Sequence, residues 1–241
     1  RKEFIRNPSL DEFETLYSLS KGLIKRITIA PEIPGGLKFI KEVKKKYEII
    51  ISLGHSNADY QTAIRAIEAG ASMSTHTFNA MTSFHHRDPG LVGAILSRED
   101  IIAEIIADGV HIHPATFHIT YACKGARGIV VVTDSTAVTG LADGIYELDG
   151  ERVIVKDGCV KTLKGVLAGT ALTFDQILRR LVRDFGISLK DAVIMATDTP
   201  ARAVGLRYRG RIAENYYADI TILDKDLNVR ATYVNGKLVY E

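Results

Sequence analysis

The sequence contains few cysteines, and this excludes an architecture held together by disulfides. Cys123 and Cys159 are the only two in 241 residues, and they lie far apart without CxxC spacing. A disulfide framework needs several cysteines at close, regular spacings. We therefore expect the protein to work in a reducing compartment, the cytoplasm.

Long apolar runs and an excess of one charge are also missing. No run reaches the roughly 18 apolar residues that a membrane span needs, and no basic-then-apolar signal pattern opens the chain. Lys and Arg number 31 against 29 Asp and Glu, and these charges are scattered along the sequence. We therefore expect neither a membrane nor a nucleic-acid partner, and a small molecule as the ligand.

Short β-branched runs recur, and each is followed by a longer segment with helical apolar spacing. The runs occupy residues 26–30, 48–53, 71–75, 104–107 and 128–133. Continuous apolar stretches such as Ile49-Ile50-Ile51 are typical of strands buried on both faces. The pattern predicts an α/β protein with a parallel sheet covered by helices.

Every predicted strand is followed by polar residues. Those residues are Pro31-Glu32, His55, His76, Asp108 with His111, and Asp134. In a β/α barrel the active site gathers at the carboxyl ends of the strands, so these groups would share one mouth. A barrel needs eight strands, and an open half-barrel would expose two edges. The alternatives are a barrel whose other three strands precede this chain, or a different, open sheet.

The pattern changes after Asp134. Glycine-rich turns and short alternating segments predict a β-hairpin insertion near 140–165, and helical spacing returns at 174–184 and 189–196. Three strand-like segments close the chain, at 219–223, 230–234 and 237–240. We therefore predict barrel structure over 1–208 and a small β-structure over 209–241.

Two histidines are candidate metal ligands. His55 and His76 each come just after a predicted strand. Neutral imidazoles suit a zinc-like ion, and a catalytic site typically takes three protein ligands and leaves a position for water. The ordinary alternative is that each histidine only satisfies its own strand-end turn. Their equivalent places on adjacent strands favour the ligand interpretation.

Three further residues have side chains that suit proton transfer or anion binding: Asp134, Arg87 and His111. A carboxylate beside a metal-bound water accepts a proton and later returns it to the leaving group, although Asp134 also suits a cap or a turn. Arg87 and His111 suit an anionic group such as phosphate; the alternative for Arg87 is an ion pair with Asp88 or a neighbouring chain. The histidines without a predicted role are His85, His86, His113 and His118.

Six motifs carry a family resemblance by their combination and order. They are Leu53-Gly54-His55-Ser56, Thr75-His76 with Asn79-Ala80-Met81, Arg87-Asp88-Pro89-Gly90, Ala107-Asp108-Gly109-Val110-His111, Val132-Thr133-Asp134 and Leu167-Ala168-Gly169-Thr170. Together they resemble the amidohydrolase superfamily and, within it, the N-acetylglucosamine-6-phosphate deacetylases. The resemblance implies a (β/α)8 TIM-like barrel of the metal-dependent hydrolase type, with strands 4–8 in this chain and a small C-terminal β-sandwich part.

The resemblance also implies an activity and a set of roles. The reaction would be hydrolysis of the N-acetyl group of N-acetyl-D-glucosamine 6-phosphate to D-glucosamine 6-phosphate and acetate. His55 and His76 would bind a divalent metal ion, zinc or else iron, cobalt or manganese, and Asp134 would be the acid/base. Substrate would be bound by Asn79, Ala80, Arg87, Asp108, Gly109, Val110, His111, Leu167, Ala168 and Gly169. The family's dimers imply a homodimer in which Arg87 or His111 acts across the interface.

The sequence departs from the family pattern at one metal ligand. The family's metal-binding glutamate lies in a His-Leu-Glu-Gly-Pro type segment on the third strand, and neither that segment nor the substrate-contacting histidine that follows it occurs here. We expect both upstream of Arg1, together with three barrel strands and half of the sandwich, so this chain alone should bind metal poorly. Glu32 is not assigned as a substitute.

Two other functions fit parts of the pattern. One is another amidohydrolase, acting on a cyclic amide, a dipeptide or an N-acyl amino acid; the anion-binding residues Asn79, Arg87 and His111 favour the deacetylase over it. The other is a non-catalytic sugar-phosphate binding module, which would bind its ligand without metal.

Overall fold

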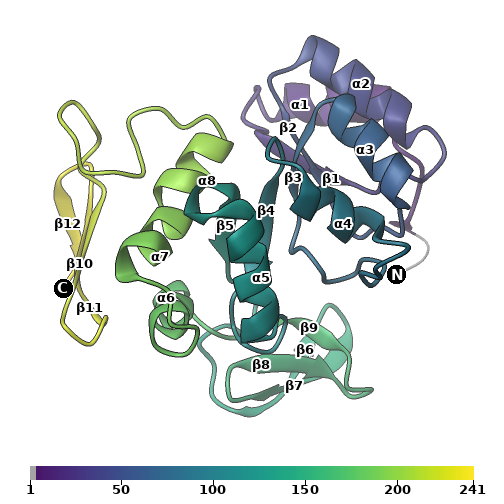
Figure 1. The fold of residues 1–241 in the computed structure, drawn as a ribbon. Helices are drawn as coiled ribbons and strands as arrows, with labels where there is room; N and C mark the ends of the chain where they lie inside the picture. The colour runs from purple at the N-terminus through teal and green to yellow at the C-terminus, as the bar shows by residue number, and fades with distance from the viewer. Residues whose placement is uncertain (1–3) are drawn as a thin grey trace. The chain divides into compact units, whose positions relative to one another are not determined.

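The computed structural model describes residues 4–241 and forms two compact units, 1–104 and 105–241 (Figure 1). In the first unit, helices and strands alternate. Its elements are α1 (Leu10–Leu19), β1 (Arg26–Ile29), α2 (Gly36–Lys46), β2 (Ile50–Leu53), α3 (Tyr60–Glu68), β3 (Ala71–Ser74), α4 (Gly90–Ser97) and β4 (Ile102–Ile106), which crosses the boundary.

The strands of the first unit form parallel pairs. Strand β1 pairs with β2, β2 with β3, and β3 with β4. Leu53, the last residue of β2, is level with Ile29 of β1 and with Ser74 of β3. Because these strands end level, the turns that follow them lie at one edge of the sheet.

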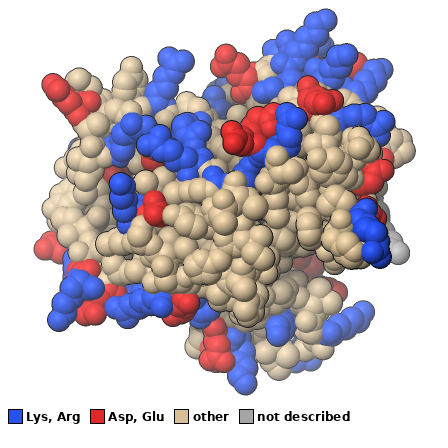
Figure 2. Space-filling view, viewed as in Figure 1, with Lys and Arg blue, Asp and Glu red and all other residues tan. Residues whose placement is uncertain are grey.

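Helix α2 packs through one face and exposes its lysines. Ile40 and Val43 are fully buried, whereas the last turn carries three lysines. Figure 2 shows basic and acidic side chains interspersed over the visible face, apart from a basic group over α2. The helix starts close behind the turn after β1: a Cβ on Gly36 would lie 2.7 Å from the carbonyl oxygen of Pro31, so only glycine fits there.

The second unit contains helices and two antiparallel sheets. Its elements are α5 (Pro114–Lys124), η2 (Ala126–Gly128), β5 (Ile129–Val132), β6 (Gly144–Leu148), β7 (Glu151–Lys156), β8 (Cys159–Thr162), β9 (Leu167–Thr170), α6 (Phe174–Arg183), α7 (Leu189–Ala196), α8 (Asp198–Ala203), β10 (Ile220–Leu223), β11 (Val229–Val234) and β12 (Lys237–Tyr240). Strands β6 to β9 form a four-stranded sheet. One face of it buries Val153, Val155 and Val160, which pack with Val138 and Ala171.

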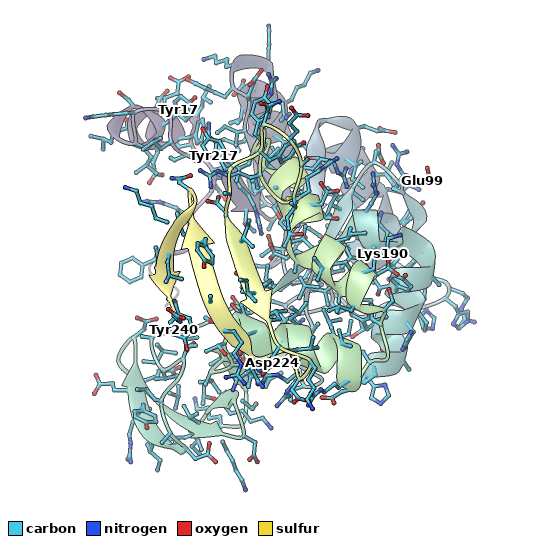
Figure 3. The ribbon with its side chains drawn as sticks, turned by 90° about the vertical axis from the view of Figure 1, so that its left-hand side faces the viewer. Tyr17, Glu99, Lys190, Tyr217, Asp224 and Tyr240 are labelled. Carbon is cyan, nitrogen blue, oxygen red and sulfur yellow. The ribbon has the colours of Figure 1, made fainter. Side chains whose placement is uncertain are left out.

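The C-terminal strands β10, β11 and β12 form a separate three-stranded antiparallel sheet. Figure 3 shows Tyr217 before β10 at one end of this sheet and Asp224 after β10 at the other. Asn235 and Gly236 join β11 to β12 with φ values of 51° and 75°. Two consecutive left-handed residues are what a two-residue hairpin turn of type I′ requires.

Most predicted elements are present. All five predicted parallel strands occur, and β4 begins two residues earlier than predicted, at Ile102. The sheet holds five strands in the order β1-β2-β3-β4-β5, so an α/β fold with a parallel sheet is confirmed, while its closure into an eight-stranded barrel stays a prediction. The predicted hairpin region, 140–165, holds the three strands β6, β7 and β8, and β9 follows it at 167–170. The domain boundary at 208/209 stays a prediction. No helix within residues 4–241 is long and apolar enough to cross a membrane.

Candidate active site

The two candidate metal ligands meet at the edge of the first unit. The Nε2 atoms of His55 and His76 lie 2.8 Å apart, and the two rings are nearly perpendicular, at 74°. Both residues have left-handed backbones, with φ of 49° and 32°, which is uncommon for side chains other than glycine. Gly54 permits the close approach, because a Cβ there would lie 2.7 Å from Cβ of Thr75.

The turn after β3 fixes the orientation of the His76 ring. Its Nδ1 lies 3.1 Å from the main-chain oxygen of Asn79, and a carbonyl can only accept, so Nδ1 carries the proton. Nε2 then presents its lone pair toward His55. A carbonyl that fixes the tautomer in this way is a common support for a metal-binding histidine.

The paired nitrogens suit a divalent ion in chemistry and approximate spacing. Two nitrogens bound to tetrahedral zinc lie about 3.3 Å apart, so the pair would open by roughly half an ångström. Across residues 4–241, no group of three His, Cys, Asp or Glu side chains converges on one point. Within these residues, His55 and His76 are therefore the two candidate ligands of a metal site.

Glu32 supports the turn that carries His55. One carboxylate oxygen accepts from the Ser56 hydroxyl at 2.7 Å, and the other accepts from the Asn57 main-chain N–H at 2.6 Å. These oxygens are engaged by the two residues that follow His55. The arrangement makes Glu32 a support for the turn, in line with leaving it unassigned as a ligand.

The predicted substrate residues of the first unit adjoin the histidine turns, except Arg87. The carbonyl of Ala80 accepts from the Ser56 N–H at 3.0 Å, which joins the two turns. Asn79 accepts from His76 and also donates its side-chain amide to the His76 carbonyl at 3.3 Å. Arg87 is exposed, and its Nη1 lies 2.8 Å from Nε2 of His86; among the described residues it makes no ion pair with Asp88.

In the second unit, Asp108 organises the loop 108–111. One oxygen accepts from the main-chain N–H groups of Val110 and His111, at 2.8 and 2.7 Å. The other lies 2.6 Å from Nδ1 of His111, and the two side chains are 2% and 4% exposed. Burial raises the pKa of Asp108, but the hydrogen bonds from His111 and Val110 outweigh it, and the pKa is lowered. The ionised carboxylate therefore orients His111, while Gly109 and Val110 form the exposed tip of the loop.

Arg180 also holds this loop, and the sequence carries no signal for it. Its Nη1 donates to the Asp108 carbonyl at 2.5 Å from helix α6, 72 residues further along the chain. Sequence periodicity identifies α6 as a helix but not which distant carbonyl one of its arginines reaches. A contact of this kind is found only from the structure.

Asp134 lies beside the segment 167–169. It follows β5 with φ of 53°, and its carbonyl accepts from the Thr170 N–H at 3.1 Å. A Cβ on Gly169, whose φ is +79°, would lie 2.6 Å from that carbonyl oxygen. The segment belongs to strand β9, and Leu167 and Ala168 are half-buried in it. The Asp134 side chain is exposed.

The predicted residues other than Arg87 thus form three groups. His55, His76, Asn79 and Ala80 belong to the first unit. In the second unit, Asp134 adjoins Gly169 in β9, the strand that also holds Leu167 and Ala168, and Asp108, Gly109, Val110 and His111 form a loop.

Known proteins resemble this chain over nearly its whole length. The N-acetylglucosamine-6-phosphate deacetylase of Lysinibacillus sphaericus is 35% identical, with 98% of this chain and 61% of the relative aligned. The N-acetylgalactosamine-6-phosphate deacetylase of Escherichia coli O157:H7 is 36% identical, over 98% and 62%. The chain therefore spans about 60% of the length of these curated relatives.

Solved structures of deacetylases are also similar to this chain. The N-acetylglucosamine-6-phosphate deacetylase of Pasteurella multocida superimposes with a TM-score of 0.92 at 36% identity, over 100% of this chain and 63% of that one. A mutant of the Mycobacterium smegmatis enzyme, in complex with N-acetyl-D-glucosamine-6-phosphate, gives 0.94 at 32%, over 100% and 64%.

A sequence model of a whole protein family also matches this chain. The model of the amidohydrolase family, whose members generally depend on divalent metal ions, matches residues 3–239. This match covers almost every residue and includes all the motifs that resemble the family. The chain belongs to the amidohydrolase family.

Proposed function

We propose that this chain provides the metal-binding histidines, the acid/base and the phosphate-binding residues of an N-acetylglucosamine-6-phosphate deacetylase. The reaction hydrolyses the N-acetyl group to give D-glucosamine 6-phosphate and acetate. The observation that carries the proposal is the convergence of the His55 and His76 Nε2 atoms at 2.8 Å, in turns where hydrolytic relatives are aligned with this chain. Zinc is the first candidate ion, ahead of iron, cobalt or manganese.

The difficult steps of amide hydrolysis are attack by water and departure of the amine. His55 and His76 would hold a divalent ion, which would supply a more acidic water and a polarised carbonyl. Asp134 takes the proton that the water loses, and its exposed carboxylate leaves it free to return that proton to the departing nitrogen.

We assign the binding of the phosphate to His111 and Arg87. The Asp108 carboxylate keeps the proton of His111 on Nδ1 and so fixes how the ring presents Nε2 to a ligand. Arg87 offers a planar fork that matches phosphate oxygens, and we propose that Arg87 or His111 acts across the interface of a homodimer. We assign Asn79 and Ala80 of the first unit, and Leu167 to Gly169 of the second, to binding of the sugar.

The C4 epimer of the substrate is a second candidate. The relative from E. coli O157:H7 that is 36% identical bears the name N-acetylgalactosamine-6-phosphate deacetylase. The metal-binding, acid/base and phosphate-binding residues assigned above act on the amide and the phosphate, which both sugars share. The configuration at C4 therefore has to be decided by experiment.

The test is an assay of amine release by the full-length protein with added divalent metal, on both sugar phosphates. We expect release from N-acetylglucosamine 6-phosphate, and a loss of roughly 10²- to 10⁴-fold in kcat for Asp134→Asn with metal content unchanged. Absence of release from a folded, metal-loaded protein would favour an amidohydrolase of uncharged amides. Tight binding of the sugar phosphate without metal would favour the binding module.

A further inference from the structure

A buried ion pair lies in the strands next to the histidine turns. Glu104 in β4 has a side chain that is 6% exposed, and Arg26 in β1 has one that is 26% exposed. Nη1 of Arg26 donates to Oε2 of Glu104, and Nη2 donates to Oε1 at 3.1 Å. A buried carboxylate is tolerated when it is paired and its remaining acceptor sites are used.

Glu104 uses those acceptor sites on the turn after β3. Its Oε1 accepts from the His76 main-chain N–H at 3.1 Å, and its own carbonyl accepts from the Thr77 N–H at 2.8 Å. One residue of the neighbouring strand thus binds two consecutive main-chain donors of the turn that carries a candidate ligand.

This support falls where the backbone needs it. With φ of 32°, His76 has a conformation that is unfavourable for a residue with a Cβ and persists only when its surroundings enforce it. Hydrogen bonds to a charged acceptor are among the stronger ones. Asn79 fixes the rotation of the ring, whereas Glu104 fixes the main chain from which the ring projects.

Arg26 extends the contact into a polar layer below the turn. Its Nη2 donates to Oγ1 of Thr75 at 3.0 Å. The same Thr75 oxygen lies 2.6 Å from Oγ of Ser52 and 2.9 Å from Oγ1 of Thr28. The layer links side chains of β1, β2 and β4 to the residue just before His76, so Arg26 holds Glu104 in place while bracing the same turn.

We propose that Glu104, held by Arg26, is a positioning residue for His76: its carboxylate fixes the turn after β3 so that Nε2 of His76 meets Nε2 of His55. Only the use of the nitrogen pair for metal rests on the proposed function.

Two double variants of the full-length protein separate this role from that of a buried ion pair. Arg26→Met with Glu104→Gln removes both charges and keeps an acceptor for the His76 N–H. Arg26→Met with Glu104→Leu removes both charges and the acceptor. The two differ in one side chain of similar size, and Ile40→Val, a buried change on α2, serves as a control for lost stability.

The first readout needs no metal. We expect the His76 amide to exchange with solvent roughly tenfold faster in the Leu variant than in the Gln variant, measured by NMR on the metal-free proteins, with Ile40→Val like the parent. Equal rates in the two double variants would overturn the proposal. If the Leu variant does not fold, amide exchange in the parent protein is the test. A His76 amide that is not protected from exchange in the parent would overturn the proposal.

The second readout is Co²⁺ affinity by competition with a chelator. We expect the Leu variant to bind Co²⁺ roughly tenfold more weakly than the Gln variant, with an altered Co²⁺ absorption spectrum. Equal affinities at equal melting temperatures would overturn the proposal while leaving the metal site intact. If His55→Ala does not change Co²⁺ binding by the parent, the proposed metal site is wrong, and amide exchange alone decides the role of Glu104.

Discussion

At the scale of the residue, the loop 108–111 depends on one carboxylate. The buried Asp108 accepts three hydrogen bonds, from two main-chain N–H groups and the His111 ring. In Asp108→Asn an amide NH2 group replaces one carboxylate oxygen, and this donor faces the ring N–H of His111. We expect a loss of about 2 kcal/mol in the free energy of unfolding and a higher KM for the sugar phosphate, measured by urea unfolding and steady-state kinetics. An unchanged KM in a destabilised protein would remove His111 from the phosphate site.

A pair of glycines isolates the contact between Asp134 and β9. Gly169 and Gly165 have nearly equal φ, +79° and +81°. A Cβ on Gly169 would lie 2.6 Å from the Asp134 carbonyl oxygen and 2.6 Å from Cγ2 of Thr136, whereas a Cβ on Gly165 would meet nothing within 4 Å. Both alanine variants bear the cost of left-handed backbone, about 1 kcal/mol, and only Gly169→Ala adds a clash. We expect Gly169→Ala to lower kcat and stability more than Gly165→Ala. Equal losses would show that the close approach is unimportant.

The sequence predicts residues near strand ends better than it predicts their partners. His55 and His76 could be found because each follows an apolar run at an equivalent place. The supports could not be found in this way, since Arg26 and Glu104 are 78 residues apart and Arg180 and Asp108 are 72 apart. Periodicity describes which face a residue occupies, and it carries no information about a partner on a distant element.

At the scale of the element, the connection from β10 to β11 is closed by Asp224. Its Oδ1 accepts from the N–H groups of Asp226 and Asn228, at 2.8 and 2.9 Å, and Oδ2 accepts from Arg230 at 3.0 Å. Hydrogen bonds from the main chain and side chain of Asn228 are the largest cause that lowers the pKa of Asp224, to about 2.

This lowered pKa predicts how the C-terminal sheet responds to acid. A carboxylate whose pKa is lower in the folded state stabilises that state above its unfolded pKa of about 3.9. The stabilisation is lost as the pH falls through about 2. We expect the stability difference between the parent and Asp224→Asn, followed by chemical unfolding, to shrink between about pH 4 and pH 2. A difference that stays constant over this range would contradict the prediction.

Element boundaries were predictable where burial is uniform. Strand β5 reads as an unbroken apolar run, Ile129 to Val132, and its bounds differ from the predicted 128–133 by one residue at each end. The start of β4 was placed too late because Glu104 interrupts the run and resembles a boundary, whereas it is an inward-facing, paired carboxylate of the strand. Strand β9 was missed because its sequence, Leu-Ala-Gly-Thr, lacks the β-branched residues typical of strands.

At the scale of the whole molecule, bound metal should stabilise the fold. A ligand at one hundred times its Kd adds about 2.7 kcal/mol to the free energy of unfolding. We expect added Zn²⁺ or Co²⁺ to raise the Tm of the full-length protein by about 3–5 °C. His55→Ala and His76→Ala should abolish the shift, and His118→Ala, an exposed residue of α5, should keep it. A full shift in His76→Ala would place the ion elsewhere.

The ion pair between Arg26 and Glu104 has a consequence for how the sequences of related proteins diverge. Loss of the carboxylate leaves a buried guanidinium unpaired, and loss of the guanidinium leaves a buried carboxylate unpaired, so each single change costs more than both together. Descendants that abandon the pair should therefore abandon both members. Among related chains, the first and fourth of these strands should record correlated substitutions at these two positions, although 78 residues separate them.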